Sequence, residues 1–218
     1  MSRITVIGGT GYAGSAIAEE AAARGHLVTV LSRSLPDAPI PGVTYVQGDA
    51  TDEATLSSVI EGSDIVVDAI APRGPLVGHA RDVHRTIARL ADVAGVRLFI
   101  VGGASSLRPA PGADRFVTDP SHLGLIPAEL HDEIRDGAAF IIEDLPATPA
   151  TLDWVYVSPA LRFGAHMPTG RLGRYRLGDE VAVQPEDGGA ISAADYALGF
   201  VDLIEKGDHH RAQVNLGH

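Results

Sequence analysis

The stretch VIGGTGYAGSA, residues 6–16, joins a short apolar run to an alanine-rich segment and decides the fold class. Its glycines Gly8, Gly11 and Gly14 follow the G-x-x-G-x-x-G spacing of a dinucleotide-binding turn. Gly8 permits a sharp strand-to-helix turn, Gly11 lets the backbone approach a pyrophosphate, and Gly14 lets the helix pack closely on the strand. The free N–H groups of residues 10–13 then face the phosphates. A glycine turn without a ligand is the alternative, which the position and context disfavour.

Strand-like runs alternate with helix-like segments over the first 160 residues. The predicted strands cover residues 3–8, 26–32, 43–49, 63–71, 97–103 and 153–159. The predicted helices cover residues 13–24, 52–62, about 76–94 and about 128–145, the second of them capped by Thr51 or Asp52. This alternation is typical of the α/β class and predicts a Rossmann-type, doubly wound parallel sheet with helices on both faces.

The pattern changes after residue 160. The elements expected there are a hairpin over residues 173–183 that turns at Gly178 and Asp179, a helix over residues 191–207 with Ser192 and Asp195 in capping-box spacing, and a strand over residues 212–216. We expect one NAD(P)-binding domain over residues 1–218, in which residues from about 160 to 218 form a small C-terminal substrate lobe.

Composition excludes several classes of function. The chain has 218 residues and a formal net charge of −11, whereas nucleic-acid binding needs clustered basic side chains. It has no cysteine, which excludes disulfides, thiol catalysis and cysteine-ligated metals. Its nine histidines show no metal-ligand spacing, and no run reaches the roughly 18 apolar residues of a membrane span. We expect a cytoplasmic monomer or homodimer without metal, nucleic-acid or membrane partners.

The end of the second predicted strand bears on which dinucleotide binds. NAD sites usually end this strand with Asp or Glu, which bonds the ribose 2′-hydroxyl. Here the strand ends with Ser32, Arg33 and Ser34, so no carboxylate repels a 2′-phosphate and Arg33 is placed to neutralise it. The sequence therefore predicts NADP(H) in preference to NAD(H). The alternative is that Arg33 is a solvated loop arginine.

Neighbouring strand ends complete the expected cofactor site. Asp49 and Ala50 follow the third strand and are expected near the adenine, while residues 69–71 pass along the bound cofactor. The predicted cofactor-binding set is Gly8, Thr10, Gly11, Tyr12, Ala13, Gly14, Ser32, Arg33, Asp49, Ala50, Ala69, Ile70 and Ala71.

Two further groups of residues are candidates for the reaction side of the site. Ser105 and Ser106 follow the fifth strand, where this fold faces the nicotinamide, and either hydroxyl is a candidate to position the carboxamide or the acceptor. A helix-capping role is the alternative. Ser158, Pro159 and Arg162 end the sixth strand at the same edge and are candidate substrate-pocket residues. For Arg162 the alternatives are an anionic group of the acceptor and a surface ion pair.

The chain lacks the Tyr-x-x-x-Lys pair of ordinary short-chain dehydrogenases, in which the Lys lowers the tyrosine pKa so that the phenol protonates a carbonyl oxygen. The residues four places after the five tyrosines are Ala16, Asp49, Ala160, Asp179 and Phe200. This disfavours an ordinary alcohol dehydrogenase or sugar epimerase. Hydride transfer between two stacked rings does not need such a pair, because the remaining proton comes from water.

Motifs along nearly the whole chain resemble those of a known group. They are IGGTGYAGSAIAEEAAARGHLVTVLSRS (residues 7–34), VQGDATD (46–52), VVDAIAPRG (66–74), RLFIVGGASSL (97–107), LDWVYVSPA (152–160), GRYRLG (173–178) and ISAADYA (191–197). They resemble the NADH-flavin reductase group of atypical short-chain dehydrogenase/reductase-like proteins, related to NmrA-like proteins and biliverdin reductase B. The resemblance implies a Rossmann core, a nicotinamide cofactor and hydride transfer to a planar acceptor. Members often carry a Tyr-Lys pair where this chain has Leu130 and His131.

The leading hypothesis is an NAD(P)H-dependent oxidoreductase that transfers hydride from NADPH to a flavin, quinone or similar planar acceptor. A flavin would then be a substrate and not a tightly bound group. The alternative, from another class, is a non-catalytic NADP-binding redox sensor of the NmrA-like type, which binds both cofactor forms and turns over neither. A nucleotide-sugar epimerase is disfavoured by the missing Tyr-Lys pair.

Overall fold

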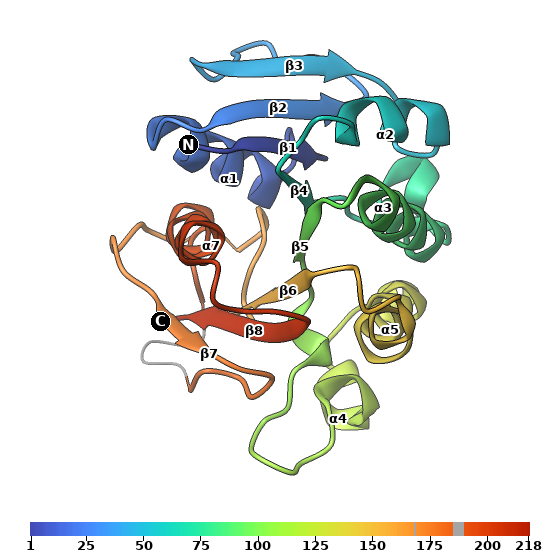
Figure 1. The fold of residues 1–218 in the computed structure, drawn as a ribbon. Coiled ribbons are helices and arrows are strands. Elements are labelled where there is room, and N and C mark those ends of the chain that lie inside the picture. The colour runs from blue at the N-terminus through green and yellow to red at the C-terminus, as the bar shows by residue number, and fades with distance from the viewer. Residues whose placement is uncertain (168, 185–189) are drawn as a thin grey trace.

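The structure, a computed structural model, describes residues 1–167, 169–184 and 190–218. Within these residues the centre of the molecule is an eight-stranded sheet of order β3-β2-β1-β4-β5-β6-β8-β7 (Figure 1). The strands are β1 (Arg3–Ile7), β2 (Leu27–Ser32), β3 (Val43–Gln47), β4 (Ile65–Asp68), β5 (Arg97–Val101), β6 (Trp154–Pro159), β7 (Arg176–Gly178) and β8 (Ala212–Gly217). Every neighbouring pair is parallel except β7 with β8, which confirms the predicted Rossmann-type sheet.

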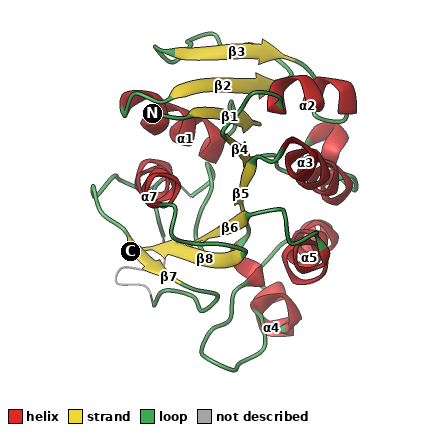
Figure 2. Ribbon diagram, in the orientation of Figure 1, coloured by secondary structure: helices red, strands yellow, loops and turns green. Residues whose placement is uncertain are grey.

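Helices cover both faces of the sheet. They are α1 (Tyr12–Ala23), α2 (Glu53–Ile60), α3 (Ala80–Ala94), α4 (Pro120–Leu123), α5 (His131–Ala139), α6 (Leu145–Ala147) and α7 (Ala193–Lys206). α1 and α7 pack together on one face, and α2, α3 and α5 lie on the other (Figures 1 and 2). No helix in the described ranges is long and apolar enough to cross a membrane.

The two helix layers bury opposite sides of the same strands. In β5, Phe99 packs into the core under α1 and α7, whereas its neighbours Leu98 and Ile100 pack under α2 and α3. β1 divides in the same way between Val6 and Ile7. Successive side chains of a strand point to opposite faces, so a strand covered on both sides needs a continuous apolar run. This is why the central strands are evident from sequence.

Local hydrogen bonds begin two helices where the sequence predicts. The carboxylate of Asp52 accepts hydrogen bonds from the N–H groups of Ala54 and Thr55 and caps α2. The hydroxyl of Ser192 accepts one from the N–H of Asp195 and caps α7. Both contacts satisfy N–H groups that a helix start otherwise leaves unpaired.

Two other helices differ from the prediction. The helix expected from about residue 76 begins at Ala80, because a 3₁₀ turn, η1 (Gly74–Leu76), precedes it. The helix expected over about residues 128–145 is a succession of a 3₁₀ turn η4 (Ala128–Leu130), α5, a π-helical segment η5 (Phe140–Asp144) and α6. Apolar spacing does not distinguish these neighbouring helix types, and π-helical segments occur often at functional sites.

The hairpin predicted over residues 173–183 is wrong. β7 pairs antiparallel with β8, with Leu177 opposite Leu216, and the chain after β7 forms a bridge between Val181 and Arg108. The pairing partners lie far along the chain, so the local turn signal at residues 178–179 does not identify them.

The C-terminal segment is built into the same layers as the nucleotide-binding half. α7 packs on α1, and β8 extends the parallel sheet beside β6. Both chain ends therefore contribute to one continuous core, which contains Ile17 of α1 and Phe200 of α7.

Asp195 fastens the loop before β7 to the start of α7. Its carboxylate is fully buried and accepts hydrogen bonds from the N–H groups of Leu172 (2.8 Å) and Gly173 (2.7 Å) and from the Ser192 hydroxyl (2.6 Å). Burial alone raises the pKa of Asp195, but these hydrogen bonds outweigh burial and hold the pKa below its ordinary value.

We predict that Asp195→Ala lowers the free energy of unfolding at pH 7 by about 2–4 kcal/mol, because the N–H groups of Leu172 and Gly173 and the buried Ser192 hydroxyl all lose a charged acceptor. The folded-state pKa is depressed, so the stabilisation is present above the unfolded pKa of about 3.9 and is lost as pH falls through the folded pKa. Urea denaturation at pH 7 and below pH 3 measures this. The difference from wild type should shrink in acid, and a constant difference would contradict the assignment. Asp37→Ala, in an exposed loop, is the control.

Candidate functional site

A cavity of about 510 Å³ lies at the carboxyl edge of the parallel strands. It is bounded by the turn after β1, by the loops after β2, β3, β4 and β5, and by α5. All the predicted cofactor residues line it except Gly14. Open α/β sheets bind their ligands in this position, where the crossover connections diverge from the middle strands.

The glycine turn has no space for a side chain at Gly8 or Gly14, two of the three glycines of the spacing. Gly8 has φ +83°, and a Cβ there would lie 2.7 Å from the carbonyl oxygen of Ala69. A Cβ on Gly14 would lie 2.5 Å from the carbonyl oxygen of Gly8, so Gly14 packs helix against strand, as predicted, and does not face the cavity. A Cβ on Gly11 meets only the Gly8 oxygen, at 3.3 Å. The side of Gly11 that faces the cavity is therefore open to a ligand.

The start of α1 offers hydrogen-bond donors to this cavity. Gly11 is the N-cap, and no side chain caps the helix. The first N–H groups of a helix have no partner within the helix, and the helix dipole makes this end favourable for anions. Thr10, Gly11, Tyr12 and Ala13 all line the cavity. The turn is therefore suited to hold a pyrophosphate.

Arg33 follows β2 and lines the cavity. Its guanidinium lies against Gly74, where a Cβ would be 3.3 Å from Nη1, and within the described residues it makes no hydrogen bond or ion pair. The nearby carboxylate of Asp49 accepts hydrogen bonds from the N–H and hydroxyl of Thr51, both 2.9 Å. These bonds, with the charge of Arg33, hold the pKa of Asp49 below its usual range. The Arg33 side chain is thus exposed at the cavity.

Ser105 and Ser106 both line the cavity, as predicted. The Ser105 hydroxyl lies 3.1 Å from Nε2 of His122. The Ser106 hydroxyl donates to the carbonyl of Gly103 and accepts from the amide of Gln213. Ser106 is thus held within the protein, while Ser105 is the serine hydroxyl nearer to a ligand.

The predicted substrate residues Ser158, Pro159 and Arg162 do not line this cavity. Ser158 is fully buried, and its hydroxyl accepts a hydrogen bond from Gln213 of β8. Pro159 pairs with β8 inside the sheet, and Arg162 is exposed. β8 covers the strand end that the sequence suggested was open. The following residues, Phe163 and Gly164, reach the cavity in their place.

α5 supplies a cavity wall that the sequence analysis missed. Leu130, Glu133, Ile134, Gly137 and Ala138 line it. Residues 130, 133, 134, 137 and 138 have the spacing of one helix face, and this pattern could have predicted the wall from the sequence. His131 is turned away, because its Nε2 contacts the backbone carbonyls of residues 123 and 126. Of these two neighbouring residues, Leu130 therefore faces the cavity and His131 does not.

Tyr156 of β6 lies in the cavity wall near Ser106. Its hydroxyl accepts a hydrogen bond from the N–H of Gly103 at 3.0 Å. Burial raises the pKa of the Tyr156 phenol, so the phenol is neutral and a weak acid. No lysine accompanies it, because Lys206 is the only lysine of the chain.

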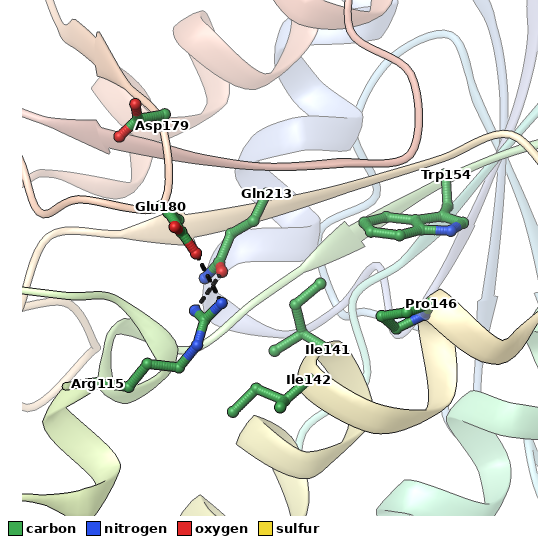
Figure 3. Close-up of a pocket in the computed structure, with 8 residues that line it drawn as sticks. All are labelled: Arg115, Ile141, Ile142, Pro146, Trp154, Asp179, Glu180 and Gln213. Atoms are coloured by element: carbon green, nitrogen blue, oxygen red, sulfur yellow. Dashed lines mark hydrogen bonds and ion pairs between the residues drawn. The ribbon is translucent and has the colours of Figure 1, made fainter. Parts of the chain in front are cut away.

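Figure 3 shows a second, smaller cavity of about 300 Å³. Arg115 projects into it, pairs with Glu180 at 2.7 Å and donates to Gln213 at 2.8 Å. Ile141, Pro146 and Trp154 form its apolar side. Among the described residues, no group of three or more His, Asp or Glu is placed to hold a metal ion.

Comparison with known proteins identifies the family. The model of an NAD(P)H-binding family matches residues 8–206. The chain belongs to this NAD(P)H-binding family. Its relatives include the uncharacterized protein YwnB of Bacillus subtilis, 32% identical over 95% of this chain and 94% of that protein.

Two solved structures are similar over the full chain. A protein of Bacteroides thetaiotaomicron described as a "putative epimerase" matches with a TM-score of 0.85 and 30% identity, covering 100% of this chain and 97% of that one. A "putative NADH-flavin reductase" of Streptococcus pneumoniae matches with a TM-score of 0.82 and 28% identity, covering all of both chains. The resemblance drawn from the sequence motifs is thereby confirmed.

The geometry fits the nicotinamide dinucleotide that the family binds. Among the described residues no side chain caps the start of α1, and the space beside Gly11 admits a pyrophosphate. The adenosine half is expected beside Arg33 and Ala50, and the nicotinamide half beside Ser105.

We predict that Gly11→Val abolishes cofactor binding without unfolding the chain. Its side chain would occupy the space that the pyrophosphate needs, while only one protein atom lies within 4 Å of the new Cβ. Titration calorimetry with NADPH and circular dichroism check the two parts. Gly170→Val is the matched control, since a Cβ there meets nothing within 4 Å and the residue does not line the cavity. Retained NADPH binding by Gly11→Val would refute the assignment of the turn.

Proposed function

We propose that the protein is an NADPH-dependent reductase that transfers hydride to a planar acceptor such as a flavin or quinone. The observation that supports this most is the continuity of the cavity. It runs from the glycine turn to an apolar wall formed by Leu130, Ile134, Ala138 and Phe163. An apolar wall beside a nicotinamide site suits a flat ring more than a hydroxylated sugar.

For this hydride transfer the protein mainly has to position the two reacting rings. NADPH, when bound, supplies the hydride. The chain's own residues must bring the two rings into contact and keep water out. Phe163 packs edge-on against Tyr12, with ring centroids 5.2 Å apart, and both line the cavity. This aromatic contact therefore forms part of the cavity lining.

Ser105 is the proposed positioning group at the reacting end. It follows β5, and its hydroxyl reaches both the cavity and His122. Burial lowers the pKa of His122, so this imidazole is neutral near pH 7 and the Ser105 hydroxyl has a hydrogen-bond acceptor. Both lone pairs of the hydroxyl oxygen are then free to accept hydrogen bonds, for example from the carboxamide N–H groups of the cofactor.

The direct test is consumption of NADPH by the purified protein with and without FMN or menadione. We expect oxidation that depends on the acceptor. Binding of NADPH without consumption in the presence of either acceptor would contradict the proposal and favour the non-catalytic sensor.

The preference for NADPH is proposed to rest on Arg33. Its guanidinium makes no bond within the described chain, and no carboxylate stands at the end of β2 to bind a 2′-hydroxyl. A charge-assisted bond to a 2′-phosphate contributes about 1.5–3 kcal/mol.

We predict that Arg33→Ala weakens NADPH binding roughly 10- to 100-fold and changes NADH binding less than about threefold. Fluorescence titration with each nucleotide measures both constants. Arg89→Ala is the control, since Arg89 is an exposed arginine paired with Glu53 on a helix surface. Equal losses for the two nucleotides would remove Arg33 from the 2′-phosphate site.

A further inference from the structure

A buried acid–imidazole pair lies at the wall of the main cavity. Asp68 ends β4 and is fully buried, and His84 lies in the second turn of α3 and is 9% exposed. Nδ1 of His84 is 2.6 Å from Oδ2 of Asp68. The other carboxylate oxygen accepts a hydrogen bond from the N–H of Ile70 at 3.2 Å. Both carboxylate oxygens are therefore used within the protein.

The imidazole ring is held in one orientation. It stacks on Phe140 with ring centroids 5.0 Å apart and an interplanar angle of 24°. Nδ1 faces Asp68, so Nε2 is the ring nitrogen left for a ligand, and no described residue bonds it. His84 lines the same cavity as the glycine turn and Ser105.

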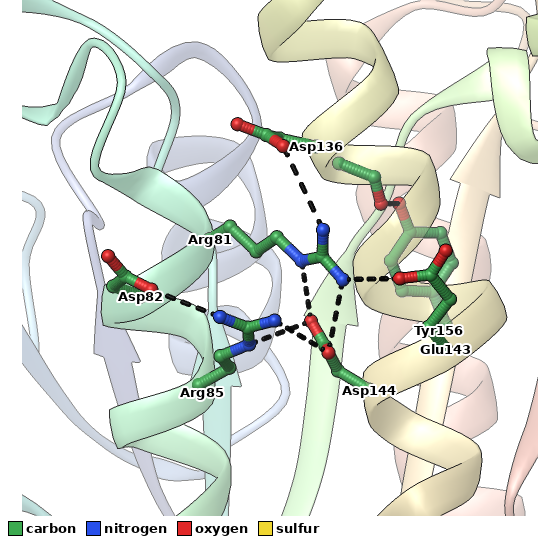
Figure 4. Close-up of polar contacts among 8 residues, drawn as sticks. Arg81, Asp82, Arg85, Asp136, Glu143, Asp144 and Tyr156 are labelled. Atoms are coloured by element: carbon green, nitrogen blue, oxygen red, sulfur yellow. Dashed lines mark hydrogen bonds and ion pairs between the residues drawn. The ribbon is translucent and has the colours of Figure 1, made fainter.

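Ion pairs fix the helix that carries His84 against the segment that carries Phe140 (Figure 4). Arg81 of α3 binds Asp144 at 2.7 Å and Glu143 at 2.7 Å, and Arg85 binds Asp144 at 2.9 Å. Asp144 is the last residue of the π-helical segment η5. The π-helical segment thus places Phe140, its first residue, against the imidazole ring. Asp144, its last residue, is held to α3 by ion pairs.

The Asp68–His84 pair is not an efficient way to stabilise the fold. Burying a carboxylate and an imidazole costs desolvation, which apolar residues of similar volume avoid. A buried pair that still presents a nitrogen to a cavity is typical of a functional site.

We propose that His84 donates a proton to the acceptor during reduction and that Asp68 is its positioning residue. This rests on the proposed function and names its substrate class: acceptors, such as quinones, whose oxygen must be protonated as the hydride arrives. The Nε2–H bond of protonated His84 breaks and its electron pair stays on nitrogen. The proton forms the new O–H bond of the acceptor, and solvent returns a proton to Nε2. Asp68 remains a carboxylate throughout.

Other groups at the cavity are less suited to this step. Burial lowers the pKa of His122, so that ring holds a proton poorly. Burial raises the pKa of Tyr156, which makes the phenol a weaker acid. The Asp68 carboxylate, in contrast, holds Nδ1 of His84 at 2.6 Å, which leaves Nε2 as the ring nitrogen available to the cavity.

The kinetic test compares two acceptors. Reduced FMN takes its proton from water, whereas menadione needs one in the closed site. We expect His84→Gln to lower kcat with menadione about 100-fold. The KM for menadione and the turnover with FMN should change less than about twofold. We expect Asp68→Asn to lower turnover with menadione about 10-fold. His26→Gln is the matched control, because His26 is 8% exposed and contacts Glu205 far from the cavity.

Equal losses with both acceptors, or no loss with menadione, would overturn the proposal. Wild-type protein that reduces FMN but not menadione would overturn it as well. Wild-type protein that consumes NADPH with neither acceptor would instead contradict the proposed function, before any variant is made.

A spectroscopic measurement tests the contact without turnover and without relying on a variant that might unfold. We expect the ¹⁵N resonance of the His84 Nε2 to shift when menadione is added to the wild-type protein saturated with NADP⁺. An unchanged Nε2 resonance, with menadione shown to bind by calorimetry, would refute the proton donor.

Discussion

The close contact between the first glycine turn and the neighbouring strand β4 is the constraint on which the site depends. Gly8 adopts a φ of +83° directly over the carbonyl of Ala69, and Gly14 packs α1 onto Gly8 itself. Any side chain at either position would push the helix away from the sheet. The approach brings the start of α1 beside the residues that follow β4, so the donors of the helix and the backbone after β4 face one cavity.

The sequence predicts this half of the site well because its signals are local. The spacing of Gly8, Gly11 and Gly14, the serine and arginine after β2, and the apolar runs of the strands each act within a few residues. The reaction side depends on contacts between distant segments. Ser158 is covered by Gln213, 55 residues away, and β7 pairs with β8 and not with its neighbour in sequence. Neither relation leaves a periodic signal.

The wall formed by α5 is a second feature that could be predicted only in part from the sequence alone. An apolar and acidic stretch predicts a helix, but only the packing shows that Leu130 faces the cavity while His131 bonds to backbone carbonyls. His84 and Asp68 appear in sequence as one helix histidine and one strand-end aspartate, 16 residues apart. Their pairing follows from the crossover of β4 into α3, which brings the first turns of the helix back over the strand end.

The cavity therefore combines a glycine turn fixed by backbone geometry with a wall assembled from α3, α5 and β5. The chain has no Tyr-x-x-x-Lys pair, and under the proposed function the polar groups of this wall take over the proton transfer that such a pair performs.

A crystal structure of the protein with NADP⁺ tests the central claim most directly. The account predicts the pyrophosphate against the N–H groups at the start of α1, the 2′-phosphate against Arg33, and the nicotinamide between Ser105 and the α5 wall. Nucleotide bound elsewhere, or with its pyrophosphate away from the glycine turn, would contradict it.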